Sequence, residues 1–237
     1  MLFKRACIWE YLQKNPAEHI ERPRPKNKEM DFLTVEELNL FLSKVDKEYY
    51  PFFLTAALTG MRRGELFALR WSDINWATNQ IHVRQSYVLG KVEEPKSKHS
   101  IRAIIIPPTL RQVLRKHQLS CPKSERDLVF PNQNCGYLAG PNLLRRHFYP
   151  ALRRAGLRRI RFHDLRHTYA SILIAQGENI KFIQNQLGHG SIQVTLDRYG
   201  HLMPEIQHGA SERLEQTVFG SKNGSKTGFG APAPPTH

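Results

Sequence analysis

The chain has 237 residues, enough to bury a core in one large domain or two small ones. Its 35 Lys and Arg exceed its 21 Asp and Glu, and the net charge of +14 favours a partner made of phosphates, although a ribosomal or other basic protein would share it. Three irregularly spaced cysteines argue against a disulfide framework or a zinc site, and no run of about 18 apolar residues predicts a membrane helix, so we expect a reduced, cytoplasmic protein.

The N-terminal part of the chain predicts helices joined by a linker. Residues 1–20 are expected to form one short helix, and the charged, proline-broken residues 21–28 a linker. Thr34 and Glu37 have the spacing of a capping box, which opens a helix through about Lys44. Hydrophobic patterning predicts the remaining helices at residues 51–58, 62–69, 110–119, 142–155, 163–176, 179–187, 192–199 and 205–218.

Strands are expected between the helices at 62–69 and 110–119. Residues 81–87 alternate between polar and apolar side chains, and residues 101–106 predict a second strand, with a polar connection between the two. Residues 75–78 extend this to a three-stranded antiparallel sheet. The expected fold class is therefore α+β, mainly α, with one small sheet. The Gly-, Ser- and Pro-rich residues 220–237 are expected to form a disordered tail.

Chemistry-bearing residues gather in the C-terminal half. His163 and Arg166 lie three positions apart, so on a helix they project from one face and offer a proton-handling group beside a fork that binds phosphate. Glycines on both sides of His189 let its backbone turn sharply, and ten residues later Tyr199 offers a phenol that can attack phosphorus. Positive charge rises just before His163, in a run that contains Arg153, Arg154, Arg158, Arg159 and Arg161.

Two upstream segments complete an ordered set of motifs. Residues 59–66 read Thr-Gly-Met-Arg-Arg-Gly-Glu-Leu, and residues 95–98 read Pro-Lys-Ser-Lys. With His-x-x-Arg at 163–166, Leu-Gly-His at 187–189 and the tyrosine segment 195–201, this order resembles the tyrosine recombinase (phage integrase) family over roughly residues 32–215. The resemblance implies an integrase-like DNA breaking-rejoining fold. It also implies double-stranded DNA with attachment-type sites as the partner, and a monomer or weak oligomer that becomes a homotetramer on synapsed DNA.

The resemblance also implies a catalytic set. The tyrosine is the nucleophile and forms a 3′-phosphotyrosyl bond, while the two arginines neutralise the phosphate. The lysine protonates the leaving 5′ oxygen, the first histidine accepts or relays the tyrosine proton, and the second hydrogen-bonds the phosphate. The sequence has neither a P-loop nor a metal-type cluster of Asp and Glu, so no metal and no cofactor are expected. The set is Arg62, Lys96, His163, Arg166, His189 and Tyr199.

Three assignments have competitors. Arg63 competes with Arg62 but is expected to face solvent, and Lys98 competes with Lys96 as the general acid. Glu65 either orients Arg62 or forms an ordinary ion pair on the helix. The residues expected to bind DNA are Arg63, Lys98, Arg102, Arg158, Arg159 and Arg161.

The other histidines and tyrosines are expected outside the active set. His167 and His201 flank the motifs, and Tyr149 and Tyr169 are expected to pack in the core or a groove. The histidines expected to be structural are His19, His82, His117, His147 and His208.

The family normally places a separate helical DNA-binding domain before its catalytic domain. Residues 1–30 resemble only the end of that domain plus a linker, and residues 31–219 the catalytic domain, so the chain looks N-terminally shortened. The expected function is site-specific DNA recombination. The alternatives are a truncated relative that binds DNA without recombining it and a type IB topoisomerase-like enzyme that nicks and seals.

Overall fold

The computed structural model describes residues 2–18, 20, 31–94, 101–200, 214–215 and 217–218. The chain divides into two units, residues 1–30 and 31–237. In the first unit, α1 spans Leu2–Ile8 and buries none of its residues. The predicted N-terminal helix is therefore shorter than expected, because a short helix without a packing partner has little to extend it.

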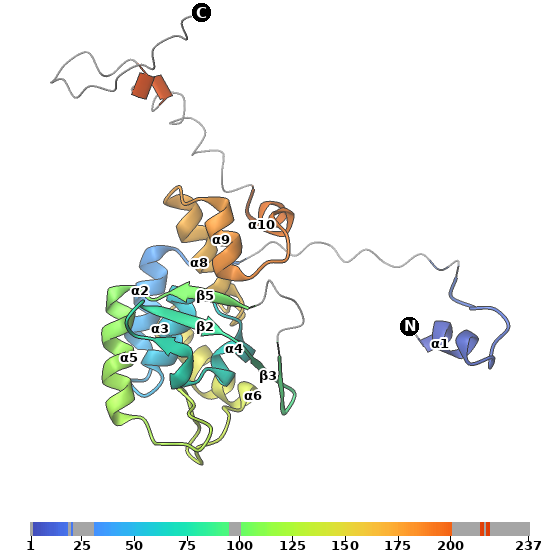
Figure 1. Cartoon of the computed structure of the whole chain (residues 1–237), viewed down its shortest axis with the longest axis horizontal. Helices are drawn as coiled ribbons and strands as arrows, with labels where there is room; N and C mark the ends of the chain where they lie inside the picture. Colours follow the sequence, from blue (N-terminus) through green and yellow to red (C-terminus); the bar gives the residue numbers. More distant parts are fainter. Residues whose placement is uncertain are drawn as a thin grey trace, which may run out of the picture. The chain divides into compact units, whose positions relative to one another are not determined.

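The second unit is mainly helical and confirms the predicted fold class (Figure 1). Each helix predicted between residues 34 and 199 is present, although the one predicted at 142–155 contains a π-helical turn, η3 (Leu144–Phe148), between α6 and α7. The helices are α2 (Val35–Lys44), α3 (Tyr50–Thr59), α4 (Arg63–Ala68), α5 (Pro108–Ser120), α6 (Gly140–Leu143), α7 (Tyr149–Arg154), α8 (Asp164–Ala175), α9 (Ile180–Leu187) and α10 (Ile192–Tyr199), with a 3-10 turn η1 (Trp71–Asp73).

The predicted three-stranded antiparallel sheet is confirmed. Its strands are β1 (Ile74–Asn75), β2 (Gln80–Val83) and β5 (Arg102–Ile105), with β2 in the centre. Figure 1 shows this sheet beside α9, and α8, α9 and α10 grouped at one end of the unit.

The prediction of one strand over residues 81–87 is wrong. The strand ends at Val83, and a second ribbon forms from β3 (Ser86–Val88), which overlaps the end of the predicted strand, and β4 (Lys91–Glu93), which lies in the expected connection. Two contacts with α4 cause the break. The side chain of Gln85 donates to the carbonyl of Ala68 at 2.7 Å, and β3 lies so close to Gly64 that a Cβ there would be 3.0 Å from the carbonyl oxygen of Tyr87.

The beginning of α2 is fixed as predicted and is tied to α8. Thr34 accepts from the backbone NH of Glu37 at 3.2 Å, and the Glu37 carboxylate accepts from the NH of Thr34 at 2.9 Å. The preceding residue, Leu33, donates its NH to the hydroxyl of Thr168 at 3.0 Å. The capping box is confirmed, and it begins α2 directly against α8.

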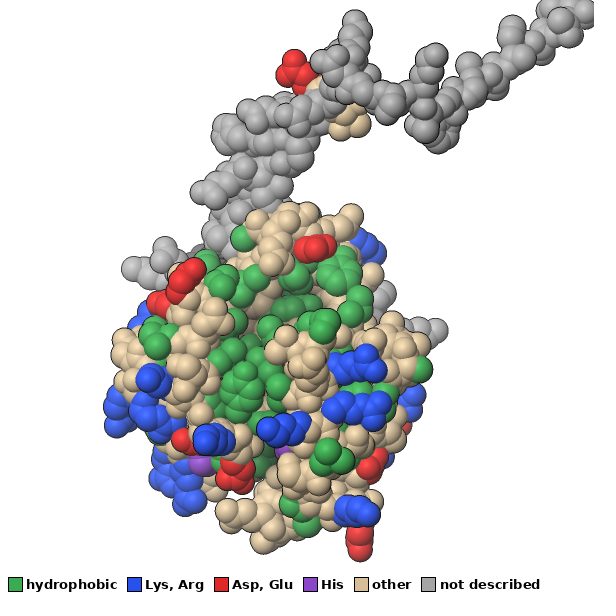
Figure 2. Space-filling model, turned by 90° about the vertical axis from the view of Figure 1, so that its left-hand side faces the viewer, with side chains coloured by type: hydrophobic (Ala, Val, Ile, Leu, Met, Phe, Trp, Pro, Cys, Tyr) green, Lys and Arg blue, Asp and Glu red, His purple; other side chains and the backbone are tan. Residues whose placement is uncertain are grey.

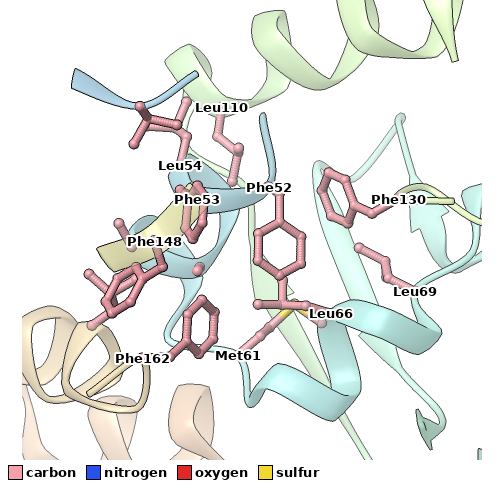
Figure 3. Packing of buried hydrophobic residues seen from close by; sticks show 14 of the residues in the cluster. Phe52, Phe53, Leu54, Met61, Leu66, Leu69, Leu110, Phe130, Phe148 and Phe162 are labelled. Atoms are coloured by element: carbon pink, nitrogen blue, oxygen red, sulfur yellow. The ribbon is translucent and has the colours of Figure 1, made fainter. Parts of the chain in front are cut away.

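An aromatic cluster anchors two segments that carry site residues (Figure 3). Phe52 on α3 packs 5.8 Å, centroid to centroid, from Phe162, which directly precedes His163. Met61, which directly precedes Arg62, is buried in the same cluster. Truncating a buried Phe to Ala typically costs about 3–5 kcal/mol, so these anchors hold both segments firmly.

Figure 2 shows one face of the molecule, which is hollowed over apolar side chains. Lys and Arg side chains lie to the left of, below and to the right of this hollow, with a few Asp and Glu side chains among them. In the part of the chain that the structure describes, no helix is long and apolar enough to cross a membrane, and no three His, Cys, Asp or Glu side chains are grouped as metal ligands.

Candidate active site

Residues from four separate segments line one polar pocket of about 280 Å³. The pocket lies among the start of α4, the start of α8, the turn after α9 and helix α10. Of the predicted catalytic set, Arg62, His163, Arg166 and His189 line it, so residues more than a hundred positions apart in sequence converge. Gly188 and Gly190, the glycines on both sides of His189, also line the pocket, together with Val194 and Arg198, which the sequence did not predict as site residues.

The C-terminus of α9 organises the arginines. Carbonyls in the last turn of a helix lack intrahelical partners and carry partial negative charge, which makes them good acceptors for guanidinium groups. Three consecutive carbonyls here each accept from a different arginine. Arg102 donates to Gln186 at 2.7 Å, Arg166 to Leu187, and Arg62 to Gly188 at 3.2 Å.

Glu65 is the buried carboxylate that holds two of these arginines. It accepts from Arg62 at 2.9 Å and from both Nη atoms of Arg102 at 3.0 and 2.8 Å. Burial raises the pKa of Glu65, but the hydrogen bond and charge of Arg102, with the charge of Arg62, outweigh burial and lower it to about 2. Glu65 therefore does more than form a helix ion pair, because it also accepts the backbone NH of Arg62 at 2.8 Å and fixes where that side chain starts.

Arg166 lies at the back of the pocket with 3% of its surface exposed. It donates to the carbonyl of Gly60 at 2.7 Å and to that of Leu187, which fixes the plane of its guanidinium. Burial, and then the charges of Arg62 and Arg102, lower the pKa of Arg166 to about 9. The group stays charged at neutral pH, and a bound anion would relieve this repulsion between arginines.

Arg62 lines the pocket and Arg63 does not. The Arg62 side chain keeps 39% of its surface exposed while bonded to Glu65. Arg63 is exposed and lies over the ring of Phe67, 6.0 Å from its centroid. The geometry thus favours Arg62 as the phosphate ligand, as the sequence predicts.

His189 is held at the pocket wall by two neighbours. Its Nδ1 lies 2.9 Å from the hydroxyl of Thr195, and its backbone carbonyl accepts from the side chain of Gln184 at 3.0 Å. Burial, and then the charge of Arg166, lower the pKa of His189 to about 3, so the ring is neutral at pH 7. With Nδ1 engaged by Thr195, Nε2 is the nitrogen left to act on a ligand.

Tyr199 contacts His167, a residue that the sequence analysis set aside. The Tyr199 side chain is 1% exposed, and its hydroxyl lies 2.7 Å from Nδ1 of His167. Burial raises the pKa of Tyr199 to about 12 and lowers that of His167 to about 4, so a neutral phenol is hydrogen-bonded to a neutral imidazole. Since His163 and His167 lie four residues apart, on the same face of α8, helical spacing would have found this residue.

His163 lies next to the pair formed by His167 and Tyr199 but takes no part in their hydrogen bond. Its ring meets the ring of His167 edge-on, with centroids 5.0 Å apart, and its Nδ1 and Nε2 make no contact with Tyr199 that the described residues show. Burial of its ring, and then the charges of His167 and Arg166, lower the pKa of His163 to about 4. The expectation that His163 accepts or relays the proton of Tyr199 stays a prediction. In this structure it is His167 whose Nδ1 lies within hydrogen-bond distance of the Tyr199 hydroxyl.

Three of the arginines expected to bind DNA have internal partners. Arg102 is buried against Glu65. Arg158 donates to Asp31, Glu37 and the carbonyl of Phe32, and Arg161 pairs with Asp164 at 2.8 Å. The acid-free run of arginines in the sequence is therefore partly neutralised by acids that the fold brings to it. Arg159 lies over the Tyr149 ring at 4.3 Å, and DNA contact by Arg63 and Arg159 stays a prediction.

Other predicted residues are placed as follows. His117 bonds the carbonyl of Val129 at 2.7 Å and His147 bonds Asp46 at 2.8 Å, as structural histidines do. Tyr169 packs on Gly60 next to the pocket, and burial raises its pKa to about 12. The residues that fall outside the described part are Lys96, Lys98, His19, His201 and His208, with the predicted tail; of the predicted helix at 205–218, only residues 214–215 and 217–218 are described.

The fold and pocket define a class of mainly helical domains that gather arginines and histidines around an anion-sized site beside a tyrosine. The chain belongs to the phage integrase family, whose model matches residues 30–205. The ICEBs1 integrase of Bacillus subtilis is 31% identical over 231 residues, covering 92% of this chain and 63% of that protein. A XerC-like tyrosine recombinase of Caldanaerobacter subterraneus is 31% identical, covering 68% of this chain and 48% of that protein.

Solved structures show the same fold. The Tn1549 transposon integrase in complex with circular intermediate DNA has a TM-score of 0.74 at 21% identity, over 90% of this chain and 75% of that one. The catalytic domain of bacteriophage HP1 integrase has a TM-score of 0.56 at 23% identity, over 80% of this chain and 98% of that one. The chain spans about half to two thirds of the length of the two relatives named above, 48% and 63%.

Proposed function

We propose that this protein is a site-specific DNA recombinase that cleaves and rejoins strands through a 3′-phosphotyrosyl bond at Tyr199. The observation that carries the proposal is the convergence of Arg62, Arg166 and His189 on one pocket, beside the helix that ends in Tyr199. Membership in the phage integrase family supports the same reading.

The pocket supplies what a cleaved phosphodiester requires. Negative charge grows on the non-bridging oxygens in the transition state, and Arg62 and Arg166 present two guanidinium forks to them. When the Thr195 hydroxyl donates to Nδ1 of His189, the proton of the neutral ring is on Nε2, which then offers the phosphate a third donor. Removing one preorganised donor of this kind typically costs about 3–4 kcal/mol of transition-state stabilisation.

The proposed step balances atoms and protons. The Tyr199 oxygen bonds to phosphorus, the bond from phosphorus to the 5′ oxygen breaks, and the products are a 3′-phosphotyrosyl ester and a 5′ hydroxyl. The phenol proton passes to the pair His167 and His163: Nδ1 of His167 lies 2.7 Å from the Tyr199 hydroxyl, and the His163 ring adjoins that of His167. Lys96, with Lys98 as the competitor, protonates the leaving oxygen. The energy of the broken bond is kept in the ester, so resealing needs no ATP.

For attack, Tyr199 must move from its present position. Its hydroxyl is buried on His167, and Tyr199 is not among the residues that line the pocket. We propose that bound DNA draws α10 toward the pocket and exchanges this hydrogen bond for contact with the phosphate.

The proposed partner is double-stranded DNA with attachment-type sites, bound by a homotetramer on two synapsed duplexes. Solved structures of relatives contain DNA, including a Tn1549 integrase complex and a XerH complex with its difH substrate. The segment 205–218 is proposed to dock on a neighbouring subunit. Sedimentation of the protein on synapsed duplexes tests this, and a protein that stays monomeric there contradicts it.

Because relatives are encoded by bacteria and phages, we place the reaction in the bacterial cytoplasm.

A pool of labelled duplexes with randomised sequence around a nick tests the function. We expect wild-type protein to capture DNA covalently, the captured DNA to share a consensus sequence, and Tyr199→Phe to capture none. Capture without a consensus favours a type IB topoisomerase-like enzyme. Salt-sensitive binding without capture shows a DNA-binding relative and overturns the cleavage proposal.

A further inference from the structure

Arg102 is a buried arginine that does not line the pocket but bonds the groups that hold the pocket arginines. It begins β5 and its side chain is 5% exposed. Both of its Nη atoms donate to Glu65 and its Nε donates to the carbonyl of Gln186. One side chain thus joins the start of α4 to the end of α9.

The groups that bond Arg102 also help to hold the two arginines of the pocket. Glu65 also receives the Arg62 guanidinium, at 2.9 Å. The carbonyl of Gln186 is followed by those of Leu187 and Gly188, which receive Arg166 and Arg62. A displacement of Arg102 therefore frees both the carboxylate and the helix end that fix the two pocket arginines.

The backbone at Gly188 is shaped to admit Arg102. Gly188 has a φ of +63°, and a Cβ there would lie 2.9 Å from Nη1 of Arg102 and 3.0 Å from its Cδ. His189, which lines the pocket, follows immediately. The arginine therefore packs under the turn that presents His189.

Strand β5 is in turn fastened to α9, so Arg102 starts from a fixed backbone. The Gln186 side chain accepts from the NH of Ile105 at 3.2 Å and donates to the carbonyl of Ala103 at 3.4 Å, as a neighbouring strand would. On the other side, Arg102 pairs in register with Val83 of β2. Sheet, α4 and α9 meet at this one residue.

We propose that Arg102 is a positioning residue for DNA cleavage, which fastens Glu65 to the last turn of α9 so that Arg62, Arg166 and His189 face one phosphate. The proposal rests on the proposed function, and it replaces the expectation that Arg102 contacts DNA. A phosphate cannot reach a guanidinium that is buried and bonded at Nε, Nη1 and Nη2.

The test separates positioning from phosphate contact. We compare wild type, Arg102→Met and Arg102→Lys on a nicked duplex of the consensus sequence recovered from the randomised pool. Two quantities are measured for each protein: the rate of covalent capture and the salt dependence of the Kd for this duplex. We expect Arg102→Met to slow capture about 100-fold, as small misplacement of catalytic groups does. The salt slope of Kd should stay unchanged, because no phosphate contact is lost. Arg102→Lys should recover part of the rate, since an ammonium keeps the charge without the fork.

Two controls complete the experiment. Arg84→Met removes an exposed arginine just after β2 and should keep capture within about twofold of wild type. Thermal unfolding checks that each variant folds. The effects of Glu65→Gln and Arg102→Lys on the capture rate should be less than additive, because both changes break the same contact. A folded Arg102→Met variant that captures DNA at the wild-type rate overturns the proposal, as does a salt slope reduced by about one. If wild type captures no DNA, the proposed function fails and this inference falls with it.

Discussion

The contact between Tyr199 and His167 shows how a buried nucleophile is kept satisfied. A buried hydroxyl without a partner costs about 1–3 kcal/mol, and the neutral ring of His167 supplies the hydrogen-bond partner. Burial also keeps the phenol protonated, because it raises the pKa of Tyr199 to about 12. The chain therefore folds with its proposed nucleophile in an inactive, protonated state.

A double-mutant cycle measures this contact without any DNA. His167→Phe should lower the free energy of unfolding by about 1–3 kcal/mol, because it leaves the Tyr199 hydroxyl unpaired. Tyr199→Phe removes that hydroxyl, so the two changes should be non-additive in urea denaturation by about 0.5–3 kcal/mol. Tyr149→Phe is the matched control and should be additive with His167→Phe. Additivity between Tyr199→Phe and His167→Phe would show that the two side chains do not interact in solution.

Stability should depend on pH through the neutral histidines. Folding lowers the pKa of His167 from 6.5 to about 4 and that of His189 to about 3, so the unfolded chain binds more protons between those values. Stability is therefore full above about pH 6.5 and falls as the pH drops toward 4, by on the order of 1–2 kcal/mol per histidine at pH 5. His163 is more exposed and should contribute less.

Thermal unfolding from pH 8 to pH 5 measures this loss. The variant His189→Gln should flatten the pH dependence. A wild-type melting temperature that rises toward pH 5 would contradict the account.

At the scale of elements, the end of α9 fixes the geometry of the pocket. Gly177 is a matched control for Gly188, because both glycines have a positive φ, +77° and +63° respectively. A Cβ at Gly188 would clash with Arg102, whereas a Cβ at Gly177 would meet nothing within 4 Å. Gly188→Ala and Gly177→Ala should each destabilise the protein by about 1 kcal/mol or more through backbone strain. Only Gly188→Ala should also slow covalent capture, because its methyl group displaces Arg102. Equal capture rates for the two folded variants would contradict the role of this turn.

Local patterns in the sequence predict most of the elements. The capping box at Thr34 and the periodic helices α8, α9 and α10 form as expected, because local propensity and tertiary packing agree there. The break after Val83 and the ribbon of β3 and β4 were not predictable, because they depend on contacts with Gly64 and Ala68 of another element. The π-helical turn at η3 likewise has no distinctive local signal.

The site divides in the same way. Four residues that line the pocket, Arg62, His163, Arg166 and His189, could be named from motifs in the sequence. The position of His167, four residues after His163, could have been found from helical spacing, but its contact with Tyr199 could not. The internal role of Arg102 could not be predicted either, because it depends on which side chains the fold buries. From the sequence alone, an arginine in a basic stretch is predicted to contact DNA. Only the structure shows whether an acidic side chain is bonded to it instead.

At the scale of the whole molecule, the charge of +14 is not all available to DNA. Arg158 is the clearest example, because its three donor nitrogens all bond Asp31, Phe32 or Glu37. Positive charge thus serves two purposes, internal bonding and attraction of the partner. Sequence charge alone does not separate them.

The salt dependence of DNA binding separates these purposes. Arg159→Gln should weaken binding and reduce the slope of log K against log salt by about 0.9, as loss of one phosphate contact does. Arg158→Gln should lower the melting temperature and leave that slope unchanged. The pair is matched in charge and sequence position. A slope that responds to Arg158 and not to Arg159 would contradict this division.

The central claim, that Tyr199 carries the strand break, is tested most directly by mass spectrometry of the captured adduct. After nuclease and protease digestion, we predict a nucleotide joined through its 3′ phosphate to Tyr199. A nucleotide on another residue such as Tyr169, a 5′ linkage, or no linked nucleotide would contradict the account.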